Sequence, residues 1–126
     1  MNRTSPLAAV LRIGDAAISK DELARRLGVA VSRFEGPKAG EGRYAQIDLP
    51  DSSDPWDTIA QHLREVGPRI EELRAEGAIG DSALDLAFGV HPNSIALSIV
   101  LPASVCEAAG RGQIDIEISI YAVNDD

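Results

Sequence analysis

Asp115 and Glu117 have the spacing that a pair of carboxylates needs for joint chemistry. They are two positions apart in a segment, 114–121, in which apolar and polar residues alternate. Residues two apart on a strand project from the same face, so both carboxylates should point the same way. Such a pair can act as general acid and base, or hold a divalent cation, when burial makes one group the weaker acid. Nothing in the sequence predicts burial here, and a solvated polar face is the simpler interpretation.

The same predicted sheet face carries other polar residues and several small apolar ones. A flat patch of this kind suits pairing between two subunits or docking of another protein, although scattered surface alanines would produce the same pattern. The candidate interaction face comprises Val10, Arg12, Asp85, Ser98, Val100, Asp115, Glu117, Ser119 and Tyr121.

A glycine-bearing segment, Gly36 to Arg43, is the candidate ligand loop. Lys38 and Arg43 would supply its positive charge, and the loop could close over a pocket beside Trp56. A phosphate-binding loop is not favoured, because the G-x-x-x-x-G-K-[ST] pattern is absent and Arg43 leads into a predicted strand instead of a helix.

The other reactive side chains form no recognisable catalytic or metal-binding pattern. His62 and His91 are the only histidines, and neither has a partner at the spacing of a metal site or a triad. The single cysteine, Cys106, falls in a predicted short helix, where a small buried hydrophobic side chain is the expected role. We therefore expect no catalytic, metal-binding or cofactor-binding residues, and no cofactor.

The longest amphipathic stretch, Asp54 to Glu76, should be the helix that covers the sheet. Gly67-Pro68 lies inside it and predicts a kink or a break, because proline removes one helical hydrogen bond. Steps of three and four place one apolar stripe on a 3.6-residue helix, and this stripe consists of Trp56, Ile59, Ala60, Leu63, Val66, Ile70 and Leu73.

Two shorter helices are also indicated. Ser19 and Glu22 have the spacing of a capping box and predict a helix over 20–27, ended by Gly28. Residues 102–109 predict the other. The segment 21–34 is similar to the first part of a DNA-binding helix-turn-helix, but the chain breaks too soon afterwards for a recognition helix.

Period-two alternation of apolar residues predicts five strands, at 7–13, 44–49, 83–90, 95–101 and 114–121. The third and fourth are expected to form an antiparallel hairpin. The resulting order is β-α-β-α-β-β-α-β, and each strand is apolar on one face only. This pattern predicts an α+β fold: a two-layer α/β sandwich with a five-stranded, mostly antiparallel sheet and helices on one face, in a single domain spanning 1–126.

Composition limits the range of partners. The 126 residues carry a formal net charge of −8, so the protein should repel nucleic acid and anionic membrane surfaces. No stretch approaches the length of a membrane-spanning segment, and no targeting segment is visible. A single cysteine fits a reducing compartment, so we expect a cytoplasmic protein. The acidic charge and the lack of long apolar stretches lead us to expect that it binds neither nucleic acid nor membranes.

The order of several landmarks resembles a bacterial family of domains of unknown function, number four-two-seven-nine. The matching features are Leu11-Arg-Ile13, the helix Asp21 to Gly28, the loop to Gly42-Arg43, Trp56 with His62-Leu63, and the ending from Leu101-Pro102 to Ile120-Tyr121. Some members of such families look like immunity proteins encoded beside toxins. The resemblance implies a fold and permits an immunity-type role.

Three functional hypotheses follow. The first is a non-enzymatic protein-binding module, with an immunity-type inhibitor as its special case, whose acidic surface complements a basic partner. The second is a small-molecule-binding sensor or enzyme subunit that uses the candidate ligand loop. The third is a structural homodimer built on the outer sheet face.

Overall fold

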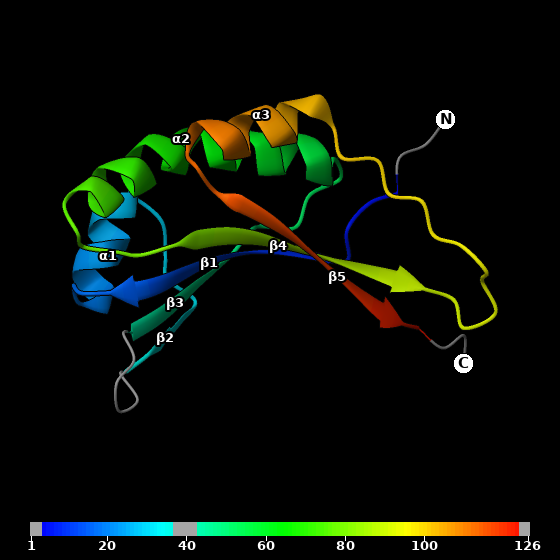
Figure 1. Cartoon of the computed structure of the whole chain (residues 1–126), viewed down its shortest axis with the longest axis horizontal. Coiled ribbons are helices and arrows are strands. Elements are labelled where there is room, and N and C mark those ends of the chain that lie inside the picture. Colours follow the sequence, from blue (N-terminus) through cyan, green and yellow to red (C-terminus); the bar gives the residue numbers. More distant parts are fainter. Residues whose placement is uncertain (1–3, 37–42, 124–126) are drawn as a thin grey trace.

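The computed structural model describes residues 4–36 and 43–123 and contains one five-stranded mixed sheet and three helices (Figure 1). In chain order the elements are β1 (Ala8–Ala16), α1 (Lys20–Leu27), β2 (Arg33–Glu35), β3 (Arg43–Asp48), α2 (Pro55–Ala75), β4 (Ser82–Val90), α3 (Ala103–Arg111) and β5 (Asp115–Ala122). The α+β class and the mostly antiparallel five-stranded sheet are therefore confirmed.

The strands are ordered β2-β3-β1-β4-β5 across the sheet. The pairs β2/β3, β3/β1 and β1/β4 are antiparallel, whereas β4 and β5 run parallel. A parallel pair needs a long connection, and here segment 91–114, which includes α3, provides it. Both edges of β4 are thereby occupied, one by β1 and one by β5.

The predicted ends of α1 and the predicted start of α2 are confirmed. Ser19 caps α1 by accepting a hydrogen bond from the Glu22 N–H at 3.2 Å, and Gly28 ends it at φ 74°. Asp54 caps α2 in the same manner through the Asp57 N–H, also at 3.2 Å. Pro68 does not break α2, which is one continuous helix. Its apolar stripe keeps the same phase on both sides of the proline, so packing holds both halves on one surface.

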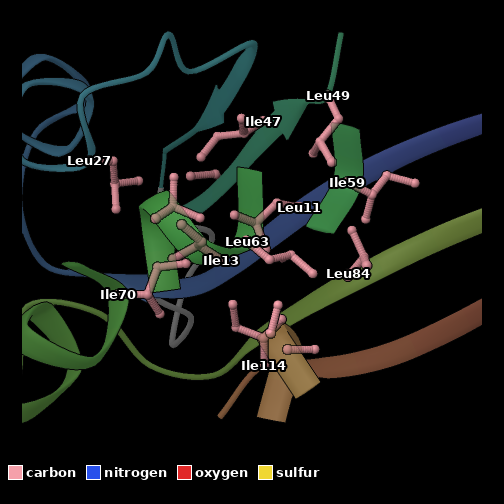
Figure 2. Packing of buried hydrophobic residues seen from close by; sticks show 14 of the residues in the cluster. Leu11, Ile13, Leu27, Ile47, Leu49, Ile59, Leu63, Ile70, Leu84 and Ile114 are labelled. Atoms are coloured by element: carbon pink, nitrogen blue, oxygen red, sulfur yellow. The ribbon is translucent and has the colours of Figure 1, made fainter. Parts of the chain in front are cut away.

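The core lies between the helices and one face of the sheet. Figure 2 shows Ile59, Leu63 and Ile70 of α2 facing Leu11 and Leu84 of the sheet, and all of these side chains are buried. The alternation predicted for the strands therefore gives the correct inward face in β1, β3 and β4. In Figure 1, α2 and α3 lie together over this face. Gly67 of α2 lies against Gly112, the residue that follows α3, because a Cβ added to Gly112 would sit 3.0 Å from the Gly67 Cα.

The predicted element order is wrong at two places. Segment 95–101 is not a strand, because β1 and β5 already occupy both edges of β4 and leave no position for a hairpin partner. The missing strand is β2, which has three residues and pairs with β3. It follows α1 directly, where a helix-turn-helix would place its recognition helix, so this part of the chain lacks that motif.

The first strand is longer than predicted. It continues through Gly14 and Asp15 to Ala16, and Asp15 adopts φ 50° where the pairing with β3 shifts register. A bulge of this kind lets a strand continue past residues that usually end one. Within residues 4–36 and 43–123, no helix combines the length and apolar character needed to cross a bilayer.

Candidate functional site

Arg12, Asp85 and Ser119 form a polar network across the outer face of the sheet. They belong to β1, β4 and β5. Arg12 Nη2 lies 2.6 Å from Asp85 Oδ2, and Ser119 Oγ donates to Asp85 Oδ1 at 2.8 Å. Asp85 is only 6% exposed although it points away from the helices. Both of its oxygens are therefore engaged, and its role is to join three strands.

The acidic pair of β5 remains in water. Asp115 and Glu117 are both exposed, and Glu117 lies beside Asp85 in the parallel register. They lack the burial on which acid-base catalysis by paired carboxylates relies. No group of three or more histidine, cysteine, aspartate or glutamate side chains suited to a metal ion occurs among the residues that the structure describes.

The remaining members of the predicted interaction face divide into two groups. Val10 and Tyr121 lie on the sheet, in β1 and β5. Ser98 and Val100 do not, because the segment after β4 forms no strand. The Ser98 carbonyl accepts a hydrogen bond from Thr4 Oγ1 at 3.4 Å, and Val100 is 54% exposed.

A second polar row on β3 extends this face. Tyr44 Oη donates to Gln46 Oε1 at 3.2 Å, and Gln46 Nε2 donates to Asp48 Oδ1 at 3.1 Å. Gln46 is the register partner of Arg12, so the row adjoins the network described above. Partial burial raises the pKa of Tyr44, and the positive charge of Arg12 opposes that rise. Tyr44 therefore stays a neutral hydrogen-bond donor at ordinary pH.

The candidate ligand loop is not assembled as a single site. Lys38 lies outside the described residues. Arg43 contacts the Ile18 carbonyl at 3.4 Å, and its guanidinium stands over the Phe34 ring. Trp56 is buried against Phe88, and its Nε1 donates to the Thr4 carbonyl at 3.2 Å. The contacts of Arg43 and Trp56 thus involve different parts of the fold.

Hollows lie beside α2 in the part of the chain that the structure describes. One of about 220 Å³ lies between α2 and α3 and includes Gly67 and Gly112 in its wall. Another of about 320 Å³ lies beside α2 and is lined by His62, Asp57 and Glu65 among others. His62 is partly buried, which lowers its pKa, while the charge of Glu65 acts in the opposite direction. Neither hollow is lined by Arg43 or Trp56.

The second half of β5 exposes large apolar side chains on both faces. Ile118 is 42% exposed and Ile120 is 53% exposed on the helix side, next to the fully buried Leu86 and Phe88 of β4. Tyr121 is 55% exposed on the outer side. Figure 1 shows the reason, since the ends of β4 and β5 extend beyond α2 and α3. The alternation that predicted inward isoleucines is correct for direction and wrong for burial.

The outer side of this strand end also carries an apolar cluster. A Cβ added to Gly89 would meet the Val123 and Leu7 side chains at 2.9 and 3.2 Å, so both lie over this glycine. Tyr121 is the register partner of Gly89. Leu7 is 63% exposed and Val123 is 37% exposed. The glycine therefore makes room for apolar groups that face water.

The two edges of the sheet differ in how they are protected. At the β2 edge the strand has only three residues, and Arg33 and Glu35 form an exposed ion pair at 2.5 Å. Short length and charge are the usual protection against unwanted strand pairing. At the other edge, β5 has eight residues, and its charges, Asp115 and Glu117, lie in its first half. Its second half, 118–122, has neither protection.

Backbone hydrogen bonds identify the groups that β5 presents at its free edge. The Val123 N–H donates to the Val90 carbonyl at 2.9 Å, so odd-numbered residues direct their backbone groups toward β4. Because successive residues alternate, Ile116, Ile118 and Ile120 direct theirs away from the sheet. No strand within residues 4–36 and 43–123 pairs with them. This edge, hereafter the β5 edge (residues 116–122), is a candidate interaction site that the sequence analysis did not identify.

The sequence signal for the β5 edge was the confinement of charge to the first half of an otherwise apolar strand.

Comparison of the chain with protein-family models, with curated proteins and with solved structures gives no match.

Proposed function

We propose that the protein is a protein-binding module that docks its partner by strand addition at the β5 edge. The observation that carries this proposal is that, within the described part of the chain, β5 has both unpaired backbone N–H and C=O groups and exposed apolar side chains. In strand addition the backbone hydrogen bonds supply affinity, and the alternating side chains supply specificity. Ile118 and Ile120 on one side, and Tyr121 on the other, are placed for the second role.

The chemistry of the chain favours a non-enzymatic role. Asp85, the buried carboxylate of the outer face, is neutralised by Arg12 and bound by Ser119. It holds strands together and is not presented to a substrate. The small-molecule hypothesis remains a prediction that no contact between Arg43 and Trp56 supports.

The charge of the chain favours a basic partner. A formal net charge of −8 raises the local concentration of cationic proteins and accelerates their association. An immunity-type inhibitor of a basic toxin is the special case that the family resemblance permits, and the cytoplasm is the compartment that we propose for it. The association of this acidic protein with a basic partner, whether a toxin or another protein, should weaken as the salt concentration rises.

Affinity purification from the native host tests the proposal. Tagged wild-type protein should recover a specific partner under low-salt conditions. Ile120→Lys should lose that partner, because a charge is placed where the added strand would lie. Ile95→Lys is the matched control, since Ile95 is fully exposed in segment 91–101 and belongs to no strand. Wild-type protein recovered without a partner, or an Ile120→Lys variant that retains it, would contradict the proposal.

A further inference from the structure

We infer that the strand added at the β5 edge is β5 of a second copy of this chain. The two copies pair antiparallel about a two-fold axis at Ile118, which joins their sheets into one. This inference rests on the proposed function, because it assigns an occupant to the same edge. Four features of β5 support it: the distribution of charge, the register of the isoleucines, the direction of the backbone groups and the absence of overhanging helices.

Charge selects the antiparallel orientation. The carboxylates of Asp115 and Glu117 occupy the first half of β5, and residues 118–122 carry no charge. A parallel copy would place Asp115 opposite Asp115 and Glu117 opposite Glu117, which destabilises strand pairing. An antiparallel copy places each acidic half against the neutral half of its partner. Two chains of the same strongly acidic protein can therefore meet at this strand without placing two carboxylates directly opposite each other.

The isoleucines select the register. With the two-fold axis at Ile118, each Ile118 faces its counterpart and each Ile116 faces Ile120 of the second copy. All three isoleucines of each copy then meet an isoleucine. On the outer face Asp115 lies opposite Tyr121, and Glu117 lies opposite Ser119. Shifting the axis to Ser119 would leave Ile116 opposite Ala122 and would reduce the apolar contact.

The backbone geometry is compatible with this register. Ile116, Ile118 and Ile120 are the residues whose N–H and C=O groups point away from β4. In an antiparallel ladder, facing residues of this type exchange two hydrogen bonds. The proposed register makes three such pairs, or about six backbone hydrogen bonds across the junction.

The space beside β5 is open on the helix side. Ile118 and Ile120 are 42% and 53% exposed, so neither α2 nor α3 covers them. An axis perpendicular to the sheet keeps the helices of both copies on the same side of the joined sheet. The isoleucines of the two copies would then shield one another from water. A basic partner that docks by strand addition would compete with the second copy for the β5 edge.

Sedimentation velocity over a range of concentrations tests the association. The wild-type protein should dimerise, and dimerisation should strengthen between 0.1 and 0.5 M NaCl because salt screens the repulsion between two acidic chains. A complex with a basic protein should show the opposite trend. Ile118→Lys should be monomeric, because the two lysines would meet on the axis, while Ile95→Lys should dimerise like the wild-type protein.

A proline pair separates loss of the junction from loss of the fold. Ile118→Pro removes an N–H that the single chain does not use, so the variant should remain folded while dimerisation weakens roughly 100-fold. Ser119→Pro removes an N–H directed toward β4 and should lower the thermal midpoint of the monomer. If Ile118→Pro dimerises like the wild-type protein, or if the wild-type protein is monomeric at every salt concentration, the inference is wrong.

Cysteine cross-linking tests the register in a Cys106→Ser background. Ile118→Cys should form an intermolecular disulfide on mild oxidation, because facing Cα atoms lie about 5.5 Å apart in such a pair. Ile120→Cys should not, because residue 120 faces residue 116 of the second copy. Cross-linking of Ile120→Cys in preference to Ile118→Cys would overturn the proposed register. A monomeric protein that still loses a partner through Ile120→Lys would leave the proposed function standing and refute the second copy.

Discussion

Replacing Gly28 by alanine tests how the end of α1 is fastened to α2. Gly28 has φ 74°, and a Cβ there would fall on Nη1 of Arg69, which donates to the Leu27 carbonyl at 2.5 Å. Gly77, at the end of α2, has nearly the same backbone, with φ 76°, and nothing within 4 Å of its added Cβ. The two positions therefore differ in the neighbouring arginine and share the same backbone penalty.

The structure gives a magnitude for each variant. An alanine in the left-handed region costs about 1 kcal/mol, and Gly77→Ala should lose about that much. In Gly28→Ala the flexible Arg69 side chain must move aside and lose its hydrogen bond, which adds about 1.5 kcal/mol for a charged donor. The total for Gly28→Ala is about 2.5 kcal/mol, or roughly 10 °C in melting temperature for a chain of this size.

The assay is urea unfolding. Gly28→Ala and Gly77→Ala are each measured in the wild-type protein and in an Arg69→Met background. The excess cost of Gly28→Ala over Gly77→Ala should disappear in that background, because no hydrogen bond to Leu27 remains to be lost. Equal losses for the two variants in the wild-type background would refute the role assigned to Arg69.

Three further predictions concern other parts of the fold. Asp85→Ala should destabilise the protein by about 3 kcal/mol in urea unfolding, because it leaves Arg12 without its ion pair. The double variant Arg12→Met with Asp85→Asn should lose less stability than the sum of the losses of the two single variants. Burial lowers the pKa of His62, so the unfolded chain binds a proton more readily than the folded one. Stability should therefore fall as pH drops below the ordinary histidine value of about 6.5, and His62→Gln should make the urea midpoint less dependent on pH between 5 and 7.5. Cys106 is exposed and should react with a thiol reagent in the folded protein as fast as in urea, which a slow native reaction would contradict.

The helices could be predicted closely because their signals are local. Ser19 and Gly28 mark the ends of α1 through hydrogen bonds and backbone angles that depend on a few neighbouring residues. The prediction that Cys106 would be buried is wrong, because Cys106 is exposed. The buried positions of α3 are Val105, Ala108 and Ala109, and a residue one step from Val105 turns about 100° away from them.

The strands were harder to predict because a strand requires a neighbour that the local sequence does not specify. Segment 95–101 has the alternation of a strand, and Leu97, Ile99 and Leu101 do pack against the core while the residues between them are exposed. The pattern therefore predicted the facing of residues 97–101 correctly and that of Ile95 wrongly, because Ile95 is fully exposed. It could not show that both edges of β4 were taken. Conversely, three residues are too few for β2 to show any period.

The candidate site was missed for a related reason. Alternation in β5 predicts which way Ile118 and Ile120 point, but their exposure depends on where α2 and α3 end. The outer face was easier to predict, because strand alternation alone places Arg12, Asp85 and Ser119 on it. The contacts among these residues depend on the strand order, which the sequence did not give.

The parallel pairing of β4 with β5 has a consequence for synthesis on the ribosome. Because segment 91–114 separates the two strands, β4 emerges and joins β1 well before its second neighbour exists. During that interval the nascent chain exposes the backbone groups of β4 beside Leu84, Leu86 and Phe88, which are fully buried in the finished protein. The growing polypeptide is thus prone to aggregate until residues 115–122 have paired with β4, and a chaperone would find its target on β4 during that interval.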